Sequence, residues 1–153
     1  MPGARAREFP PPRHTARLSI DDQELFVSCW GTGELKRYDV SNPASPKETG
    51  SVRIGGIVER SPHPASGPVN GGPQMVEVSR DGKRVYLTNS LYASWDAQFY
   101  PEGIDGWLVK LDAGDDGSLT VDPGVFVEFS GERPHQVRLG GGDASSDSYC
   151  FPD

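Results

Sequence analysis

Histidines are the residues of this 153-residue chain best suited to hold a transition metal, and there are three of them, His14, His63 and His135. When the chain is aligned on itself by its internal repeats, described below, His14 and His135 both fall on the position of Gln74. Imidazoles that converge from repeated units can bind copper or zinc. The alternative is a histidine that caps the entrance of a strand by hydrogen bonding, and the weak strand signal of 15–17 favours this alternative for His14.

The remaining reactive side chains carry weaker signals. His63 lies between two prolines in a Pro/Gly-rich segment, 59–73, and is expected to be an ordinary surface residue. The two cysteines, Cys29 and Cys150, have no metal-binding or redox spacing, so two reduced thiols are expected. Cys29 ends an apolar run and is expected to be buried and inert. Motifs for serine hydrolases, phosphate-binding loops and zinc proteases are missing from the sequence.

An internal repeat defines the elements that must position these side chains. When the chain is slid along itself, Leu18–Ser28 lies over Val78–Thr88. Both copies follow one template. It begins with an apolar residue, Ser, any residue and Asp, and the next position is Asp or Gly. Two polar residues come next, and then an apolar, an aromatic, an apolar and a hydroxyl-bearing residue. The middle of this template supplies a tight turn, and both ends are rich in residues that favour strands. Each copy is therefore predicted to be a β-hairpin.

Two further strands follow each hairpin. The third strands are expected over 34–40 and 107–112, and the fourth over 50–57 and 125–129. Turn-rich segments separate the third strand from the fourth in both copies. Four short antiparallel strands in a unit of roughly 40 to 60 residues are typical of a β-propeller blade.

The predicted fold is therefore all-β, a partial β-propeller with blades at about 14–57 and 74–129 and the start of a third over 134–153. The third begins where 134–139 aligns with 73–78, the opening of the second blade. Residues 1–13 have no strand pattern and are expected to be a disordered or non-native start. A closed sandwich, in which strands of the two repeats face each other across one core, is the structural alternative.

The partial propeller has a consequence for association. Propellers have about four to eight blades, so an incomplete domain over 14–153 cannot close alone. It is expected to belong to a longer protein, to close by oligomerising, or to expose apolar blade faces and self-associate.

The second blade carries an insertion, 90–105, where the first makes the same connection with 30–33. Its aromatic side chains either form a small satellite core or wall a pocket, because loops on a rigid scaffold often build binding sites. The candidate pocket-lining residues are Tyr92, Trp95, Asp96, Phe99 and Tyr100.

Composition excludes several classes of protein. The chain holds 19 glycines and 14 prolines, which is incompatible with a bundle of long helices. A net charge of -7 argues against nucleic-acid binding. No apolar run approaches the roughly 20 residues needed to span a bilayer, and no apolar region follows the N-terminal arginines. We therefore expect a cytoplasmic protein without a membrane span.

Several segments resemble one known family. They are Phe26–Pro43, Asn70–Met75, Ser90–Tyr92 with Trp95–Asp96, Gln98–Pro101 and Gly141–Asp147. Together they resemble the C-terminal third of the selenium-binding proteins, also called methanethiol oxidases, and the resemblance covers about residues 18–151. It implies a seven-bladed propeller roughly three times as long as this chain.

The resemblance also implies an activity, the copper-dependent oxidation of methanethiol by oxygen and water to formaldehyde, hydrogen sulfide and hydrogen peroxide. Copper suits this reaction because a soft metal binds thiolate and exchanges electrons with oxygen. The implied ligand is a small thiol or selenium compound. This chain alone is expected to be inactive. The alternative is a non-catalytic fragment that binds selenium or thiols, or that interacts with other proteins.

The resemblance bears on individual residues as well. His135 matches a histidine that the family carries before its final glycine-rich turn, whereas His14 falls where the family usually has an apolar residue. Asp143 and Asp147 follow His135 closely enough to orient its imidazole. The family's selenium-linked cysteine belongs to an N-terminal region, so the two cysteines of this chain do not inherit its role.

Overall fold

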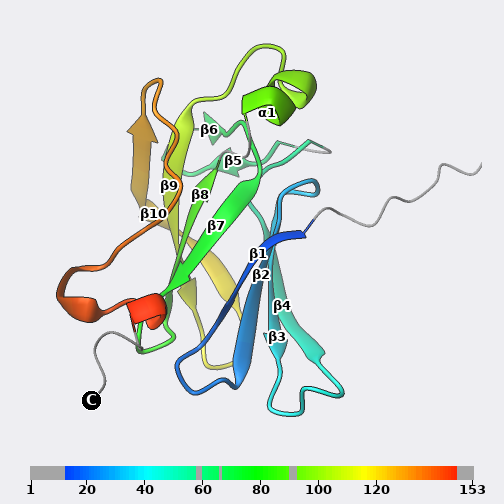
Figure 1. Cartoon of the computed structure of the whole chain (residues 1–153), viewed down its shortest axis with the longest axis vertical. Coiled ribbons are helices and arrows are strands. Elements are labelled where there is room, and N and C mark those ends of the chain that lie inside the picture. Colours follow the sequence, from blue (N-terminus) through cyan, green and yellow to red (C-terminus); the bar gives the residue numbers. More distant parts are fainter. Residues whose placement is uncertain (1–12, 58–59, 66, 90–92, 148–153) are drawn as a thin grey trace, which may run out of the picture.

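Two antiparallel sheets, each a meander of four consecutive strands, form the molecule (Figure 1). The structure is a computed structural model, and it describes residues 13–57, 60–65, 67–89 and 93–147. The first sheet contains β1 (Arg13–Leu18), β2 (Glu24–Cys29), β3 (Glu34–Asp39) and β4 (Lys47–Arg53). The second contains β7 (Pro73–Val78), β8 (Arg84–Asn89), β9 (Gly106–Ala113) and β10 (Leu119–Phe129). These sheets are the two predicted blades, called blade 1 and blade 2 below.

Shorter elements connect and extend the blades. They are β5 (Pro62–His63), β6 (Gly67–Pro68), α1 (Ala93–Phe99), η1 (Gly140–Gly142) and η2 (Ser145–Asp147). Strand bounds differ from the sequence prediction mainly in the fourth strands. β4 begins at Lys47 and ends at Arg53, and β10 begins at Leu119 because an irregularity between Val121 and Phe126 lets one long strand stay paired with β9.

The first turn of each repeat explains why the shared template folds twice in the same way. In blade 1 the Ser19 hydroxyl donates to Asp21 Oδ1 at 2.6 Å and accepts the Glu24 N–H at 3.0 Å. Ser79, Asp81 and Arg84 make the same contacts in blade 2. The residue after each aspartate has a left-handed backbone, with φ 57° at Asp22 and φ 72° at Gly82. The hydroxyl and carboxylate therefore fix the hairpin turn in both copies.

Blade 1 and blade 2 stack head to tail. Phe26 lies in the shared core, whereas its repeat counterpart Tyr86 is half-buried and outside that core. Conversely Val85 and Leu87 are fully buried in the core, and their counterparts are the residues on either side of Phe26. A sandwich related by a twofold axis would bring the same template positions together. Successive blades of a propeller instead use opposite faces, so this stacking favours the propeller over the sandwich.

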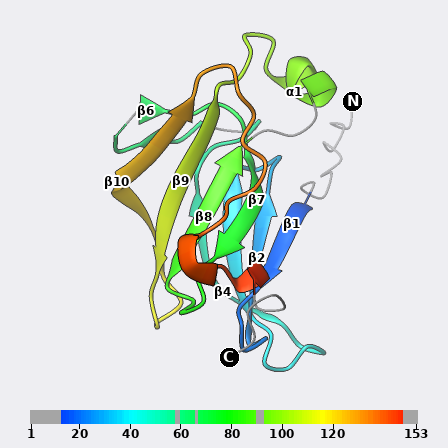
Figure 2. The ribbon, with the colours of Figure 1, turned by 60° about the vertical axis from the view of Figure 1, so that its left-hand side comes forward.

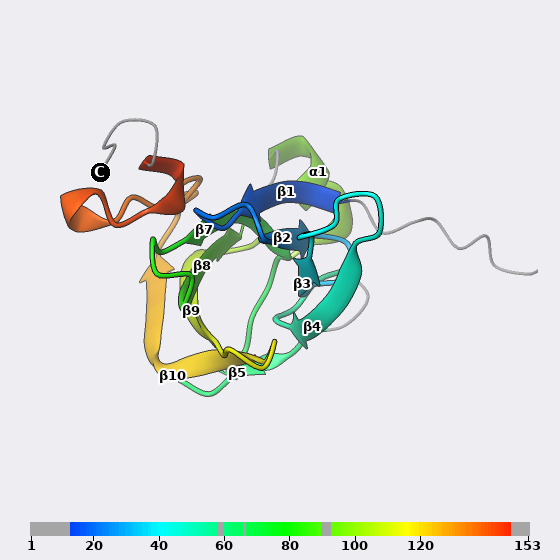
Figure 3. The ribbon, with the colours of Figure 1, turned by 90° about the horizontal axis from the view of Figure 1, so that it is seen from below.

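One apolar core lies between the blades, with β1 beside β7 and β4 toward β10 (Figure 3). Its fully buried members come from both sheets: Phe26, Leu35, Val78, Val85, Leu87, Val109 and Leu111. Burying branched side chains of this size stabilises a fold by roughly 1.5 to 3 kcal/mol each. Hydrogen bonds from Thr15 and Arg17 of β1 to main-chain carbonyls of β7 then join the two first strands.

The segment before blade 2 differs from its prediction. His63 was expected on the surface, but it is 4% exposed, and its ring packs against Phe126 of β10 with centroids 4.8 Å apart. The β5–β6 hairpin causes this burial, because it folds the Pro/Gly-rich segment back against blade 2. The His63 prediction is therefore wrong.

The segment after blade 2 crosses the face of that blade turned away from blade 1 (Figure 2). Residues 134–139 form no regular strand in the described structure, although Leu139 has an extended backbone. The glycine-rich sequence that follows turns the chain, with φ 73° at both Gly141 and Gly142. Two serines of η2 then bind β7 through Glu77, whose carboxylate accepts from the Ser146 hydroxyl at 2.5 Å.

Among the described residues, no helix is both long and apolar enough to cross a membrane.

Candidate functional site

The insertion of blade 2 packs at the end of the molecule where β7 begins and β8 ends, next to the residue that follows β2. Its residues 93–99 form α1 rather than an irregular loop. Tyr100 and Ile104, after the helix, pack with Trp30 in a cluster separate from the main core. The Phe99 ring meets Trp30 edge to face, with centroids 5.4 Å apart. The insertion is thus held against blade 1 as well as blade 2.

The backbone of Gly72 lies close to the backbone of Trp30, a member of this cluster. A Cβ at Gly72 would lie 2.0 Å from the carbonyl oxygen of Trp30, so only glycine allows the two chains to meet there. This glycine belongs to the segment Asn70–Met75 that carries the family resemblance. Its role in the structure is to seat Trp30 beneath the insertion.

A hollow of about 140 Å³ lies beside α1, and we call it the α1 hollow. It is lined by Ala93, Asp96, Ala97, Tyr100, Pro101, Gly103, Ile104 and Arg133. Tyr100 is 2% exposed, and its hydroxyl has no hydrogen-bond partner among the described residues. Burial, with the nearby charge of Asp96, raises the pKa of Tyr100 to about 12. The hydroxyl therefore keeps its proton and is a donor.

Two of the residues that line the α1 hollow, Asp96 and Arg133, are charged. The buried carboxylate of Asp96, on α1, accepts a charge-assisted hydrogen bond from Arg133 in the segment after β10. The side chain of Asp96 is 2% exposed and that of Arg133 is 41% exposed. This ion pair ties the insertion to the chain that leaves blade 2, and it leaves the hollow without a net charge.

Asn89, at the end of β8, connects the segments around this site, and the sequence analysis did not single it out. It is fully buried, and its amide nitrogen donates to the carbonyl oxygens of Asn70 at 3.1 Å and Asp105 at 2.7 Å. Its side-chain oxygen accepts the N–H of Trp107 at 2.7 Å. Asn89 therefore fixes both ends of the insertion and the loop before β7. A polar residue that closes a strand directly before an insertion is the only signal that could have revealed it.

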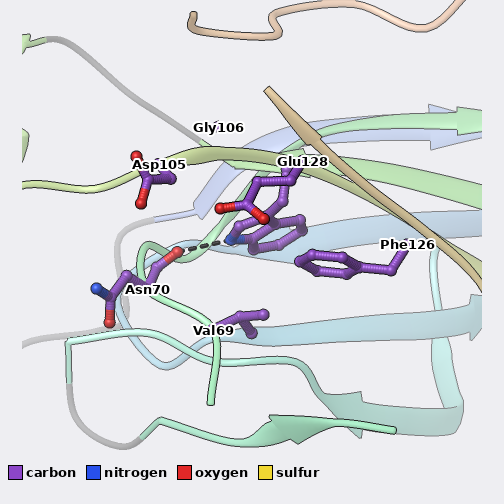
Figure 4. Close-up of a pocket in the computed structure, with 7 residues that line it drawn as sticks. Val69, Asn70, Asp105, Gly106, Phe126 and Glu128 are labelled. Atoms are coloured by element: carbon purple, nitrogen blue, oxygen red, sulfur yellow. Dashed lines mark hydrogen bonds between the residues drawn. The ribbon is translucent and has the colours of Figure 1, made fainter. Parts of the chain in front are cut away.

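A second hollow, of about 130 Å³, opens over blade 2 near these contacts (Figure 4). Asp105 and Glu128 line it with exposed carboxylates, and Phe126 and Val69 form its apolar wall. The Trp107 indole nitrogen is already engaged, because it donates to the Asn70 carbonyl at 2.6 Å. We regard the α1 hollow as the better site, because it alone presents a buried donor that has no partner in the described structure.

Three of the five predicted pocket residues, Asp96, Phe99 and Tyr100, have described side chains. Asp96 and Tyr100 line the α1 hollow, and Phe99 is 45% exposed with its ring edge on Trp30. Tyr92 lies outside the described residues. Trp95 is part of α1, but its side chain is outside the described structure.

The predicted metal-binding residues do not gather in the described structure. His135 is exposed and lies outside any strand, whereas His14 is in β1 with a side chain beyond the described atoms. The two carboxylates proposed to orient His135 bind arginines instead: Asp143 accepts from Arg84 at 2.8 Å, and Asp147 from Arg138 at 2.6 Å. No group of three or more His, Cys, Asp or Glu side chains able to hold a metal occurs among the described residues.

The structure describes one of the two cysteines. Cys29 is buried at the end of β2, as expected for a structural thiol, and Cys150 lies outside the described residues.

Comparison with known proteins places the chain in a family. The profile described as "56kDa selenium binding protein (SBP56)" matches residues 3–150. Selenium-binding protein 2 of Mus musculus and methanethiol oxidase of Homo sapiens are each 39% identical over 156 residues, which is 85% of this chain and 33% of theirs. The X-ray structure of a hypothetical selenium-binding protein from Sulfolobus tokodaii is 57% identical, with a TM-score of 0.86, and covers 94% of this chain and 31% of that one. The chain therefore spans about a third of the length of these relatives, and it belongs to the 56 kDa selenium-binding protein family.

Proposed function

We propose that the α1 hollow binds a small thiol, or its selenium analogue, as part of a protein that oxidises methanethiol. The observation that carries this proposal is the buried hydroxyl of Tyr100, a residue that lines the α1 hollow, because this proton donor lacks a partner in the described structure. A buried polar group without a partner is unfavourable, and a ligand that accepts its hydrogen bond removes that penalty.

The chemistry of the α1 hollow fits such a ligand. Methanethiol has one carbon and one sulfur atom, which a hollow of about 140 Å³ accommodates. Ala97 and Ile104 offer apolar contact to the methyl group, and Tyr100 donates to the sulfur. The Asp96–Arg133 ion pair leaves no net charge, so a neutral thiol enters without a large desolvation cost.

The reaction consumes methanethiol, oxygen and water and yields formaldehyde, hydrogen sulfide and hydrogen peroxide, and copper would supply the electron transfer to oxygen. The donor set of the described residues does not fit a copper site, because no three His, Cys, Asp or Glu side chains meet. We therefore assign this chain the binding of thiol. His135, and His14 if it contributes, would serve copper only beside ligands from elsewhere in a longer protein.

The test of this function uses a full-length relative, such as methanethiol oxidase of Homo sapiens. Replacing the residue aligned with Tyr100 by one that lacks a hydroxyl should raise KM for methanethiol about fivefold, with copper content unchanged, because one hydrogen bond is lost. Replacing the residue aligned with His135 by Ala should lower copper content and methanethiol-dependent peroxide formation. Unchanged KM in the first variant would contradict the role of the α1 hollow. Unchanged copper content and turnover in the second would favour the alternative in which His135 only caps a strand by hydrogen bonding.

A second candidate function, an interaction module, is supported by blade 1. Leu18 is 42% exposed and Ile20 is 40% exposed, and both line a groove of about 660 Å³ between this blade and η2. Exposed apolar surface of this kind is a site of association. Sedimentation should show self-association that Leu18→Asp reduces, whereas a compact, stable monomer would contradict this function.

A further inference from the structure

Hydrogen bonds join the two blades close to their first strands. The Ser28 hydroxyl, on β2 of blade 1, donates to the main-chain carbonyl of Gln74 on β7 of blade 2 at 2.6 Å. The bond is buried, and the Thr15 hydroxyl on β1 donates to the same carbonyl. Two residues further along both strands, Arg17 Nε of β1 donates to the main-chain carbonyl of Val76 of β7 at 3.5 Å. These contacts fix where β7 begins relative to blade 1.

The repeat places counterparts of both partners one blade further along the chain. Thr88 stands at the position of Ser28 in the two hairpin copies, and His135 stands at the position of Gln74 when 134–139 is aligned with 73–78. Thr88 is 1% exposed, and its hydroxyl oxygen is buried without a hydrogen-bond partner among the described residues. Buried hydroxyls in folded proteins nearly always have a partner, so this one calls for an acceptor.

The segment that contains His135 is already held on the side of blade 2 where this acceptor is needed (Figure 2). Ion pairs flank it: Arg133, before it, pairs with Asp96, and Asp143, after it, pairs with Arg84 of β8. Within the segment Val137 is 9% exposed, and its counterpart Val76 in β7 is 2% exposed. Val137 therefore repeats the burial of its counterpart in a first strand, although the segment is not paired as a strand in the described structure.

We propose that Thr88 is a positioning residue, whose hydroxyl donates to the main-chain carbonyl of His135 when 134–139 settles beside β7 as β7 lies beside β1. This bond repeats the Ser28–Gln74 contact and fixes the backbone of His135 at the end of the blades that carries the α1 hollow. It rests on the repeat and on the unpartnered hydroxyl, and it holds whether or not the α1 hollow binds a thiol.

Two substitutions of Thr88 test the bond in the whole chain. Thr88→Val keeps the shape of the side chain and removes the hydroxyl, and Thr88→Ser keeps the hydroxyl. Ser28→Ala serves as the reference, because its bond is present in the structure. We expect Thr88→Val to raise the unfolding equilibrium constant about fivefold, as Ser28→Ala does, since one net hydrogen bond is lost. Thr88→Ser should stay within a factor of two of the parent.

Nuclear magnetic resonance separates positioning from general stability. Thr88→Val should shift the carbonyl carbon resonance of His135, and Thr88→Ser should restore it, while the resonances of buried His63 stay unchanged. If Thr88→Val leaves the His135 carbonyl in place and the chain equally or more stable, the hydroxyl has no acceptor there and the proposal is overturned. A loss of stability without any shift at His135 would also overturn it, because the acceptor would then be another group.

Discussion

Blade 1 and blade 2 are built from the same template, yet equivalent positions have opposite environments. Leu18 in blade 1 is 42% exposed, whereas its counterpart Val78 in blade 2 is fully buried. Phe26 is fully buried, whereas its counterpart Tyr86 is only half-buried. Blade 2 is covered on one face by blade 1 and crossed on the other by the segment after β10, while the described structure covers blade 1 on one face alone. The template therefore fixes the hairpin, and the position of a blade in the stack decides which of its faces becomes core.

A second difference between the blades concerns function. Blade 1 joins its second and third strands by a short turn that starts at Trp30, and blade 2 makes the same connection through α1 and the α1 hollow. The short turn supplies the aromatic ring on which the long insertion rests. The same scaffold thus provides a support in one blade and a candidate site in the other.

The largest effect should come from a core position of blade 2 compared with an outer position of blade 1. Leu87→Ala should lower the free energy of unfolding by about 2 to 5 kcal/mol, because Leu87 is fully buried between the blades. Leu18→Ala, on the exposed face, should cost less than about 1 kcal/mol. Chemical denaturation of both variants measures the contrast, and equal losses would contradict the head-to-tail stacking.

A smaller effect is expected where the last segment binds blade 2. Glu77 is 1% exposed and accepts hydrogen bonds from Ser145 and Ser146, and Arg17 lies 3.7 Å away. Glu77→Ala leaves these donors without their acceptor and should lower the free energy of unfolding by about 2 to 3 kcal/mol.

Glu48→Ala is the matched control for this substitution. It breaks the exposed Lys36–Glu48 pair and should change stability by less than about 1 kcal/mol. Amide exchange would show the release of η2 in Glu77→Ala alone. Continued protection of η2 in that variant would mean that Glu77 does not anchor the segment.

Much of the fold was predictable because the information is local. The Ser-x-Asp turn of each repeat is closed by hydrogen bonds between near neighbours in the sequence, so the template alone indicates both hairpins. The burial of His63 was not predictable, because it depends on contact with Phe126, far along the chain. The same reason hides Asn89, whose partners come from two separate segments, the loop before β7 and the residues around the start of β9. The candidate pocket was predicted only as an aromatic insertion, since its closing partner Arg133 comes from beyond β10.

The smallest effect on stability concerns pH and the hairpin that covers blade 2. Burial lowers the pKa of His63, and the nearby Asp122 opposes this only in part. Its Nδ1 accepts the N–H of Ala65 at 3.0 Å, so the folded state holds the neutral ring. A histidine with a lowered pKa in the folded state contributes stability that is present above the unfolded pKa of about 6.5 and is lost as pH falls below it.

The free energy of unfolding should therefore decline between about pH 7 and pH 5, and His63→Gln should flatten the decline. Denaturation of both proteins across this range measures the difference. An identical slope in the variant would show that other groups cause the decline.

The most direct test of the central claim, that the insertion of blade 2 forms a thiol site, is a titration of the chain with methanethiol followed by amide chemical shifts at pH 7. The account predicts saturable shifts at Ala97, Tyr100 and Ile104, with binding about fivefold weaker in Tyr100→Phe and unchanged in Leu18→Ala. Shifts that avoid the α1 hollow, or equal affinity in the parent and Tyr100→Phe, would contradict it.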